Sequence, residues 1–514
     1  MRAALALIYL LMAVPVWGQP GRPERAEFPS SLAASVLTAS FEFLEPRTLE
    51  PVPVRQLALW GLRGVTSIDA GLTIEDHGVT LDLRQADRSI HQCAIPSEPT
   101  VAAWGQAGAE LMSAAWDVSE VVRGAGSQAL ITSFFDELFN HLDPYSRYVS
   151  PAAADLDRAR RSGAAGIGLV LAQVGKAFVV QSVNADGPGA EAGIIKGDSI
   201  LAVDDQPTLG ADLATVLSWI AGIDGTEVGI TLRRRDGSTQ VLDLERVVVP
   251  PETVFAEQVG NTLLVRVAGF SSDTDRRLGQ EFERFFAKGP SSRRLRGVVL
   301  DLRGNRGGLL RQAVAATSLM LENGLVAVTA GRNPSATHEW RAMAHDATEG
   351  APIVVLVDGR SASAAEIMAA ALANQGRAVV VGSSTLGKGL VQTVATLPDG
   401  GELFVTWSRV LAPLGWPVQG LGVLPQVCTS QGLDATMQQL ASLNRGRLPL
   451  ADALARHDAA RAPLPGSEVV ALRSACPAAE GREADLTAAR YLLEHPAAYA
   501  AARRSRPQFG ALKP

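Results

Sequence analysis

The chain has 514 residues, a formal net charge of −6 at pH 7, and 47% hydrophobic and 19% charged residues. This length is enough for roughly three domains, and the composition is that of an ordinary globular protein with ample material for a core. The negative net charge gives no electrostatic reason to expect nucleic acid as a partner.

An apolar segment stands at the N-terminus. Arg2 precedes a run from Ala3 to Val16, and the small residue Gly18 follows Trp17. This pattern predicts a secretory signal peptide over residues 1–18, too short for a comfortable membrane span, with an uncleaved anchor as the alternative. No other run approaches the ~18 apolar residues of a transmembrane helix, so we expect an exported protein in the periplasm or another extracytoplasmic space.

Residues 19–160 have the pattern of a helical region. Apolar residues recur at helical spacing in residues 57–62 and again in residues 130–139. Between them, two short apolar runs flank Asp76-His77-Gly78 and predict a β-hairpin insert.

Residues 163–249 change to short strands and tight turns. The turn Gly166-Ile167-Gly168-Leu169 can direct successive backbone N–H groups at a peptide's terminal carboxylate. The peptide would add as a strand after this turn, with its last side chain in an apolar pocket against a helix predicted at residues 213–221. A Gly-x-Gly alone is often only a tight turn. Together with the Ala-Gly-Ile-x-x-Gly-Asp element at residues 192–198, it resembles a PDZ domain.

A stiff connector, Arg246 to Pro251, leads into a third pattern in which buried-type strands alternate with helices, over residues 250–428. This alternation predicts an α/β domain whose mostly parallel sheet is covered on both faces. Strands are expected at residues 263–267, 297–303, 353–357 and 377–382, and helices at residues 274–286, 309–321 and 366–374.

The remaining residues, 429–514, form an alanine- and arginine-rich tail that we expect to be helical, including residues 486–502. Three cysteines occur in the chain: Cys93, Cys428 and Cys476. In an oxidising compartment Cys428 and Cys476 could bridge the α/β domain to the tail, but three independent buried thiols fit the sequence equally well. No spacing is that of a zinc site, and we expect no metal or cofactor.

Three segments of the α/β domain carry reactive residue types. A glycine pair, Gly307-Gly308, follows a predicted strand, Ser363 begins a predicted helix, and Lys388 lies in a glycine-flanked apolar run. Serine is a poor nucleophile unless a base takes its proton, and arginine cannot be that base. Only five of the 47 basic residues are lysines, so a lysine within an apolar run is unusual in this chain. Taken singly, the three segments are explained by a turn, a helix N-cap and a solvated loop charge.

Together these segments resemble the carboxy-terminal processing proteases, also called tail-specific proteases. That family has a serine before Ala-Ser-Glu and a Phe-Gly-Lys-Gly-x-x-Gln segment, and Ser363 and Lys388 show the same separation of 25 positions, with Gln392 at the glutamine. The segment His141 to Tyr148 also resembles the one that precedes the family's PDZ domain, although it reads equally as a helix stop. Three positions depart from the family pattern: Ala365, Leu386 and Gln426.

The resemblance implies a role for each residue. Ser363 attacks the scissile carbonyl, Lys388 takes its proton, and Gln392 orients the lysine amine. The last role requires a turn, because residues four apart in a strand stand about 13 Å from one another. The Ala364 N–H and one from Gly307 or Gly308 form the oxyanion hole.

Lys388 must be neutral at physiological pH to act as a base. The ordinary lysine pKa of ~10.4 has to fall by roughly three units, and burial can lower it. We expect the apolar neighbours Leu386, Leu390 and Val391 to exclude water from the amine.

We therefore predict an exported serine endopeptidase with a helical N-terminal region, a PDZ-like domain that captures apolar substrate C-termini, an α/β core that is ClpP/crotonase-like by resemblance, and a helical tail. The resemblance further implies protein substrates, an adaptor or activator protein, and a homo-oligomer. The main alternative is a catalytically silent PDZ scaffold for peptides. An esterase or amidase with the same nucleophile, or a Ser-His-Asp triad using His338 or His345, also stays open.

Overall fold

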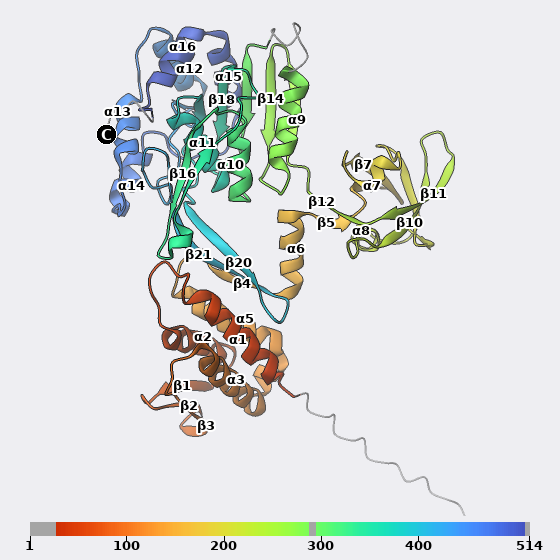
Figure 1. Cartoon of the computed structure of the whole chain (residues 1–514), viewed down its shortest axis with the longest axis vertical. Coiled ribbons are helices and arrows are strands. Elements are labelled where there is room, and N and C mark those ends of the chain that lie inside the picture. Colours follow the sequence, from red (N-terminus) through yellow and green to blue (C-terminus); the bar gives the residue numbers. More distant parts are fainter. Residues whose placement is uncertain (1–26, 287–294, 509–514) are drawn as a thin grey trace, which may run out of the picture.

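The computed structural model describes residues 27–286 and 295–508. These residues form a helical N-terminal region, a PDZ-like domain set to one side, an α/β core and a helical C-terminal region (Figure 1). The predicted signal peptide, residues 1–18, lies outside the described residues. Within the described ranges, no helix combines the length and the hydropathy needed to cross a membrane.

The N-terminal region consists of two packed helix pairs and a small sheet. Helix α1 packs on α3 and α2 packs on α5. The helices of the second pair approach closely at Gly64, which has no side chain. A Cβ added there would lie only 2.0 Å from the Ser133 carbonyl oxygen. The elements are α1 (Ser30–Leu44), α2 (Val54–Ile68), β1 (Leu72–Asp76), β2 (Thr80–Gln85), β3 (Arg88–Ala94), α3 (Val101–Val118), α4 (Glu120–Ala125) and α5 (Ser127–Asn140). The predicted hairpin is β1–β2, and the sequence missed the third strand, β3.

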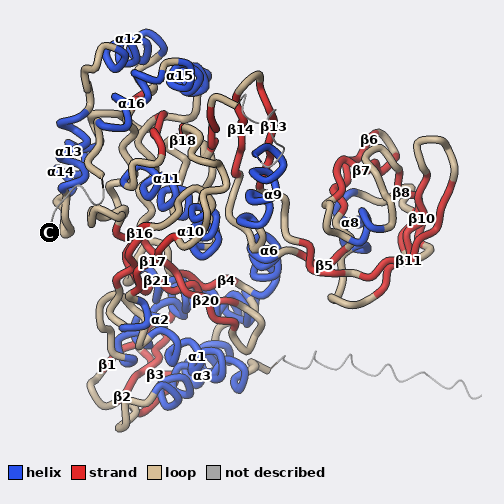
Figure 2. The backbone as a smooth tube through the Cα atoms, turned by 45° about the horizontal axis from the view of Figure 1, so that its top comes forward, coloured by secondary structure: helices blue, strands red, loops and turns tan. Residues whose placement is uncertain are grey.

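Helix α6 (Pro151–Ser162) leads into the PDZ-like domain, whose antiparallel sheet has the strand order β11-β10-β8-β7-β6. Its elements are β5 (Ala164–Gly166), β6 (Leu169–Val174), β7 (Ala177–Val183), α7 (Pro188–Glu191), β8 (Ser199–Val203), β9 (Gln206–Pro207), α8 (Leu213–Ile220), β10 (Glu227–Arg233), β11 (Thr239–Glu245) and β12 (Val247–Val249). Pairing of β5 with β12 brings the entry and exit of the domain together (Figure 2). Strand β6 lies at the edge of the sheet, so one of its sides is free.

The α/β core contains a six-stranded sheet in the order β13-β14-β15-β18-β19-β22, parallel from β14 onward. The strands are β13 (Val254–Val259), β14 (Thr262–Val267), β15 (Gly297–Asp301), β18 (Ile353–Val357), β19 (Ala378–Gly382) and β22 (Val427–Cys428). Helices α9 (Thr274–Phe286), α10 (Leu310–Ser318) and α11 (Ala364–Asn374) contribute to the hydrophobic core on one face. Three C-terminal helices, spanning Leu433–Asn444, Glu483–Glu494 and Pro496–Arg504, cover the other face. The predicted mostly parallel, doubly covered sheet is confirmed.

A second sheet, which the sequence did not predict, joins the core to the N-terminal region. Its order is β17-β16-β21-β20, and β4 pairs with β21. The strands are β4 (Arg147–Val149), β16 (Gly324–Ala330), β17 (His338–Ala342), β20 (Leu390–Thr396) and β21 (Glu402–Leu411), with a short 3-10 turn, Pro334–Ala336, before β17. Leu397, Leu403 and Val405 belong to the core of the N-terminal helices. This contact places residues 143–147 next to the start of β20.

The C-terminal region is helical, as expected. Its helices are α12 (Leu433–Asn444), α13 (Ala451–Ala459), α14 (Gly466–Arg473), α15 (Glu483–Glu494) and α16 (Pro496–Arg504). The predicted helical stretch 486–502 divides into α15 and α16, because Pro496 has no N–H to continue a helix but is well suited to begin one.

A disulfide joins Cys428 to Cys476. Of the two alternatives, the structure therefore contains the bridge and not three free thiols. Cys93 is a buried free cysteine. The bridge closes a sequence separation of 48 residues, which in the chain-entropy model stabilises the fold by roughly 4 kcal/mol.

Candidate active site

Ser363 lies in the turn between β18 and α11 with an unusual backbone conformation. Its φ is 56° and its ψ is −116°, a region that costs a residue with a side chain about 1–3 kcal/mol. The turn is held from several sides: the Ser363 N–H donates to the Glu366 carboxylate at 2.7 Å, and the Ser361 hydroxyl donates to the Leu302 carbonyl at 2.8 Å. The serine therefore sits in a strained but firmly held turn at the helix N-terminus.

Lys388 lies in the loop between β19 and β20 and is half-buried. Its Nζ lies 4.9 Å from the centre of the Tyr145 ring and has no hydrogen bond or ion pair within the described ranges. Burial lowers the pKa of Lys388, and the Arg147 guanidinium lowers it further, whereas Asp143 and Glu366 oppose the change. The loop thus favours the neutral amine that a general base needs.

Glu366, on the first turn of α11, links the two loops. It is fully buried, and one carboxylate oxygen accepts from the backbone N–H groups of Ser363 (2.7 Å) and Lys388 (2.8 Å). The other oxygen accepts from the Thr385 hydroxyl (2.5 Å) and the Gly387 N–H (2.7 Å). Burial raises the pKa of Glu366, and these hydrogen bonds oppose the increase. A single oxygen atom therefore holds the backbones of the serine and the lysine side by side.

Glu366 could have been singled out from the sequence, because it is the one acidic residue of α11, a helix of mostly apolar residues. In the structure every residue of this helix is buried. A buried carboxylate has to be paired or hydrogen-bonded, so it must meet donors from neighbouring loops.

The glycine loop after β15 lies directly against the serine turn. A Cβ at Gly307 would lie 2.9 Å from the Ser363 Cβ and 3.0 Å from the Ala364 nitrogen. The Gly307 N–H donates to the side chain of the buried Asn305 at 2.8 Å. By contrast, the N–H groups of Gly308 and Ala364 have no hydrogen-bond partner among the described residues. These two donors are the ones left free for a ligand.

Gln392 does not occupy the predicted turn, because it lies in strand β20. Its amide donates to the Tyr145 carbonyl at 2.5 Å, and no hydrogen bond between Gln392 and Lys388 occurs in the described part of the chain. Gln392 thereby fixes the segment whose Tyr145 ring covers the lysine.

The prediction that Leu386 shields the amine is also wrong, since this side chain is 51% exposed. Leu390 is buried and Val391 half-buried. Tyr145 provides part of the cover in place of Leu386, from a segment more than 240 residues away in sequence.

The other two departures from the family pattern have structural roles. Ala365 is buried within α11. Gln426 exchanges hydrogen bonds with the main chain of Val380 at 2.8 Å and is buried beside β19. Neither side chain makes a contact that a reacting group would need.

A pocket of about 620 Å³ opens between the glycine loop and strand β20. Two tryptophans, Trp340 and Trp407, make much of its apolar wall, and the exposed Arg311 has no partner among the described residues. The buried Ser408 hydroxyl in this lining also has no hydrogen-bond partner in the described part of the chain. The pocket adjoins the loops that carry Gly308 and Lys388, because residues that follow each of them in sequence line it: Leu309, Leu310, Val391, Gln392 and Thr393.

The PDZ-like domain has a second groove, of about 310 Å³, beside the free edge of β6. The predicted turn residues Gly166, Ile167, Gly168 and Leu169 line it, and α8 adds Leu217 and Ile220. Gly168 has a φ of 76°, and the N–H groups of Ile167 and Gly168 have no partner within the described ranges. The groove combines free N–H donors, an open strand edge and an apolar wall, which are the features of terminal-carboxylate capture.

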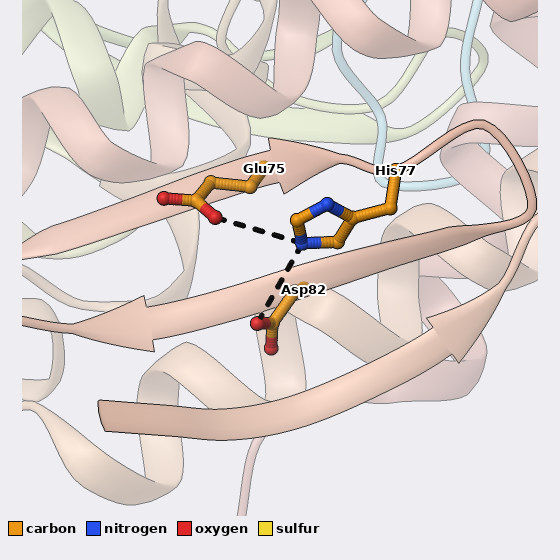
Figure 3. Close-up of side chains that lie close together, drawn as sticks. All are labelled: Glu75, His77 and Asp82. Carbon is orange, nitrogen blue, oxygen red and sulfur yellow. Dashed lines mark ion pairs between the residues drawn. The ribbon is translucent and has the colours of Figure 1, made fainter. Parts of the chain in front are cut away.

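The histidine alternative finds no support in the geometry. His338 and His345 are exposed, and neither has a hydrogen bond or ion pair to a carboxylate in the described ranges. One group with metal-ligand residue types, Glu75, His77 and Asp82, lies on the β1–β2 hairpin (Figure 3). Arg84 pairs with both carboxylates, at 3.6 and 3.0 Å, so this cluster already contains a cation.

The chain is therefore a PDZ-containing α/β protein. Its serine turn, half-buried lysine and free N–H donors suit acyl transfer. Residues 261–429 match the model of peptidase family S41, and residues 179–234 match that of the PDZ domain.

The chain is 32% identical over 309 residues to the carboxy-terminal-processing protease of Bartonella bacilliformis, covering 60% of this chain and 71% of that protein. It is 31% identical over 287 residues to the carboxy-terminal processing protease CtpA of Bacillus subtilis, covering 55% of this chain and 60% of that protein. It is also similar to the solved structure of a photosystem II D1 C-terminal processing protease, with 26% identity, a TM-score of 0.35, and coverage of 72% of this chain and 92% of that one. The chain belongs to the carboxy-terminal-processing proteases of peptidase family S41.

Proposed function

We propose that this protein is an exported endopeptidase that cleaves unfolded protein substrates through a Ser363–Lys388 dyad after capturing their C-termini in the PDZ-like domain. The observation that carries the proposal is the shared hydrogen bonding of Ser363 and Lys388 to one oxygen of Glu366. This arrangement supports a dyad because it fixes nucleophile and base relative to each other before substrate arrives.

In the proposed reaction neutral Lys388 removes the Ser363 proton as the hydroxyl oxygen attacks the scissile carbonyl. The oxyanion is stabilised by the N–H groups of Ala364 and Gly308, since the Gly307 N–H is already bound to Asn305. Protonated Lys388 then gives its proton to the leaving amine, and an acyl-enzyme forms on Ser363. Water activated by Lys388 releases the acyl group and restores the free serine.

The PDZ-like groove selects the substrate in this scheme. Free N–H groups at Ile167 and Gly168 would bind the terminal carboxylate, and the peptide would pair with β6. Leu217 and Ile220 make the wall that meets the last side chain, which favours an apolar residue there. An acidic C-terminal residue would lose its hydration without gaining a partner.

The pocket beside the catalytic loops would receive a substrate side chain near the scissile bond. Its tryptophans favour a large apolar residue, and the unpaired Arg311 offers a charge to an acidic neighbour. Identification of the cleavage sites in a mixed peptide pool tests this preference.

Export, an adaptor or activator protein, and a homo-oligomer belong to the same proposal. The Cys428–Cys476 bridge supports an oxidising compartment. N-terminal sequencing of the mature protein tests removal of residues 1–18, and light scattering tests oligomer formation.

The function is tested by following cleavage of an unfolded reporter with an apolar C-terminus, beside the same reporter ending in two aspartates and with Ser363→Ala as control. Fast cleavage of the first reporter, slow cleavage of the second and none by the variant is the expected result. Tight binding of the apolar reporter without cleavage would favour the silent scaffold. Equal cleavage of both reporters would remove the role of the PDZ-like groove.

A further inference from the structure

The segment from Arg473 to Asp485, here called the tail brace, runs from the last residue of α14 to the first turn of α15 and lies beyond the S41 match, which ends at residue 429. It contacts all three loops of the candidate active site. None of its residues belongs to the dyad or the oxyanion loop.

The brace holds the loop that carries Lys388. The Arg473 guanidinium donates to the Thr385 carbonyl at 2.7 Å and to the Leu421 carbonyl at 2.6 Å. The Ser384 hydroxyl donates to the Cys476 carbonyl at 2.6 Å. Thr385 in turn donates its hydroxyl to Glu366, so the brace supports the residues directly before the lysine.

The brace also holds the other two loops. The Gly359 N–H, in the serine turn, donates to the Ala479 carbonyl at 2.7 Å, and the Gly481 N–H donates to Asp358 at 3.1 Å. Arg303, which precedes the glycine loop, donates to the Arg482 carbonyl at 2.9 Å and to Asp485 at 3.1 Å.

The disulfide fixes the brace to the core. Cys476 lies within the brace, and its partner Cys428 ends strand β22, which pairs with β19, the strand that leads into the lysine loop. Both cysteines are buried. Without the bridge, the brace would be held by its hydrogen bonds and by α14 and α15 alone.

Resting on the proposed function, we propose that the tail brace is a positioning element for Lys388, and that the Cys428–Cys476 disulfide makes full activity depend on oxidation of the chain. The protein would thus become fully active only where its disulfide can form. Arg473 and Cys476 act through the loop and not on substrate, so they are positioning residues.

The test uses the full-length mature chain with Cys428→Ser/Cys476→Ser, Arg473→Met and Arg473→Lys, and with Cys93→Ser as the matched control for loss of a buried cysteine outside the brace. The readouts are the rate at which a fluorophosphonate labels Ser363, the kcat for the reporter, and the pH dependence of both. Circular dichroism and thermal melting establish that each variant is folded.

A loosened loop admits water to Lys388 and moves its pKa back up toward the ordinary value, so neutral lysine appears only at higher pH. The charged groups that face Lys388, namely Asp143, Arg147 and Glu366, are not substituted in these variants. We expect the double cysteine variant and Arg473→Met to lose at least about fivefold of the rate at pH 7 and to recover much of it at alkaline pH. Arg473→Lys should recover part of the loss, and Cys93→Ser should match the wild type.

Unchanged rates and pH midpoints in both brace variants would overturn the proposal. So would a loss that is the same at every pH, because that result indicates a stabilising role alone. If the wild-type protein labels at Ser363 but does not cleave the reporter, the proposed function fails while the labelling rates still test the brace.

Discussion

In the α/β core, strands β15, β18 and β19 are buried at every residue, whereas the PDZ-like strand β10 alternates buried with partly or fully exposed positions. The loops that form the two candidate sites also differ, in their hydrogen bonding. In the core, a fully buried carboxylate binds four donors from two loops. The PDZ-like groove instead presents unsatisfied N–H groups at an open strand edge. In the proposed function, the core site is therefore fixed before substrate arrives, and the groove is completed by the peptide that binds there.

The contact between the two regions is also of a different kind from the contacts inside the core. Asp186 of the PDZ-like domain pairs with Arg276 at 2.7 Å and Arg277 at 3.0 Å on α9, and these partners are largely exposed except for Arg277. Such surface ion pairs contribute little stability and are screened by salt. We therefore expect substitutions in the loops of the candidate active site to have large effects, and those at the domain contact to have small ones.

Replacing the proposed base should have the largest effect. Lys388→Ala removes the group that accepts the Ser363 proton, and we expect kcat/KM for the reporter to fall by about 10³-fold or more. Cleavage kinetics measure the loss, and Lys176→Ala, in the turn between β6 and β7, is the control. Retention of more than a tenth of the wild-type rate would mean that another group is the base.

Glu366→Gln should follow. The amide has donors where the carboxylate has acceptors, so it cannot bind all four partners, and the two loops should separate. We expect a loss of about 100-fold in kcat/KM and a stability loss of about 1–3 kcal/mol. Kinetics and urea unfolding measure these, and Glu339→Gln, at an exposed carboxylate paired with Arg341, is the matched control. A near-normal rate would show that the shared hydrogen bonding is dispensable.

In the PDZ-like domain, Gly168→Ala should weaken binding of an apolar C-terminal peptide by roughly five- to tenfold. The residue has a φ of 76°, and a Cβ there would lie 3.2 Å from the Gly187 Cα, so the turn must shift. Gly175→Ala is the control, because it shares the positive φ (64°) but its Cβ would meet no atom within 4 Å. Calorimetric titration measures the peptide affinity of both variants. Equal weakening in the two would mean that backbone strain, and not a change in the groove, lowers the affinity.

The smallest effect is expected at the domain contact. Asp186→Asn removes the ion pairs with α9, and the rate for the reporter should change less than about threefold, with a weaker dependence on salt than in the wild type. Cleavage rates at low and high ionic strength measure this. A tenfold or larger change would show that the contact controls access to the core site.

Much of the core was predictable because its strands and helices follow from local pattern. Strand β18 and helix α9 have the predicted ends, and Ser363 and Lys388 stand out through residue type and spacing. The second sheet was missed because two of its pairings, β16 with β21 and β4 with β21, join strands that are far apart in the sequence.

The side chains around the lysine were missed for a related reason. Tyr145 reaches Lys388 only because the N-terminal helices pack on the β20–β21 hairpin. The turn that the expected role of Gln392 requires does not form, because β20 begins at Leu390 and pairs with β21. The choice between Gly307 and Gly308 depends on the hydrogen bond that the Gly307 N–H donates to Asn305, which no spacing in the sequence reveals.

The central claim, that Ser363 is activated by a lysine held neutral beside it, is tested most directly by the pH dependence of fluorophosphonate labelling at Ser363. Burial lowers the pKa of Lys388, so the neutral amine should be present at a lower pH than for a free lysine. We expect a labelling rate that rises through a single titration at a lower pH than that of a free lysine, with mass spectrometry placing the adduct on Ser363, and loss of this titration in Lys388→Ala. Labelling at another residue, or an unchanged pH profile in Lys388→Ala, would contradict it.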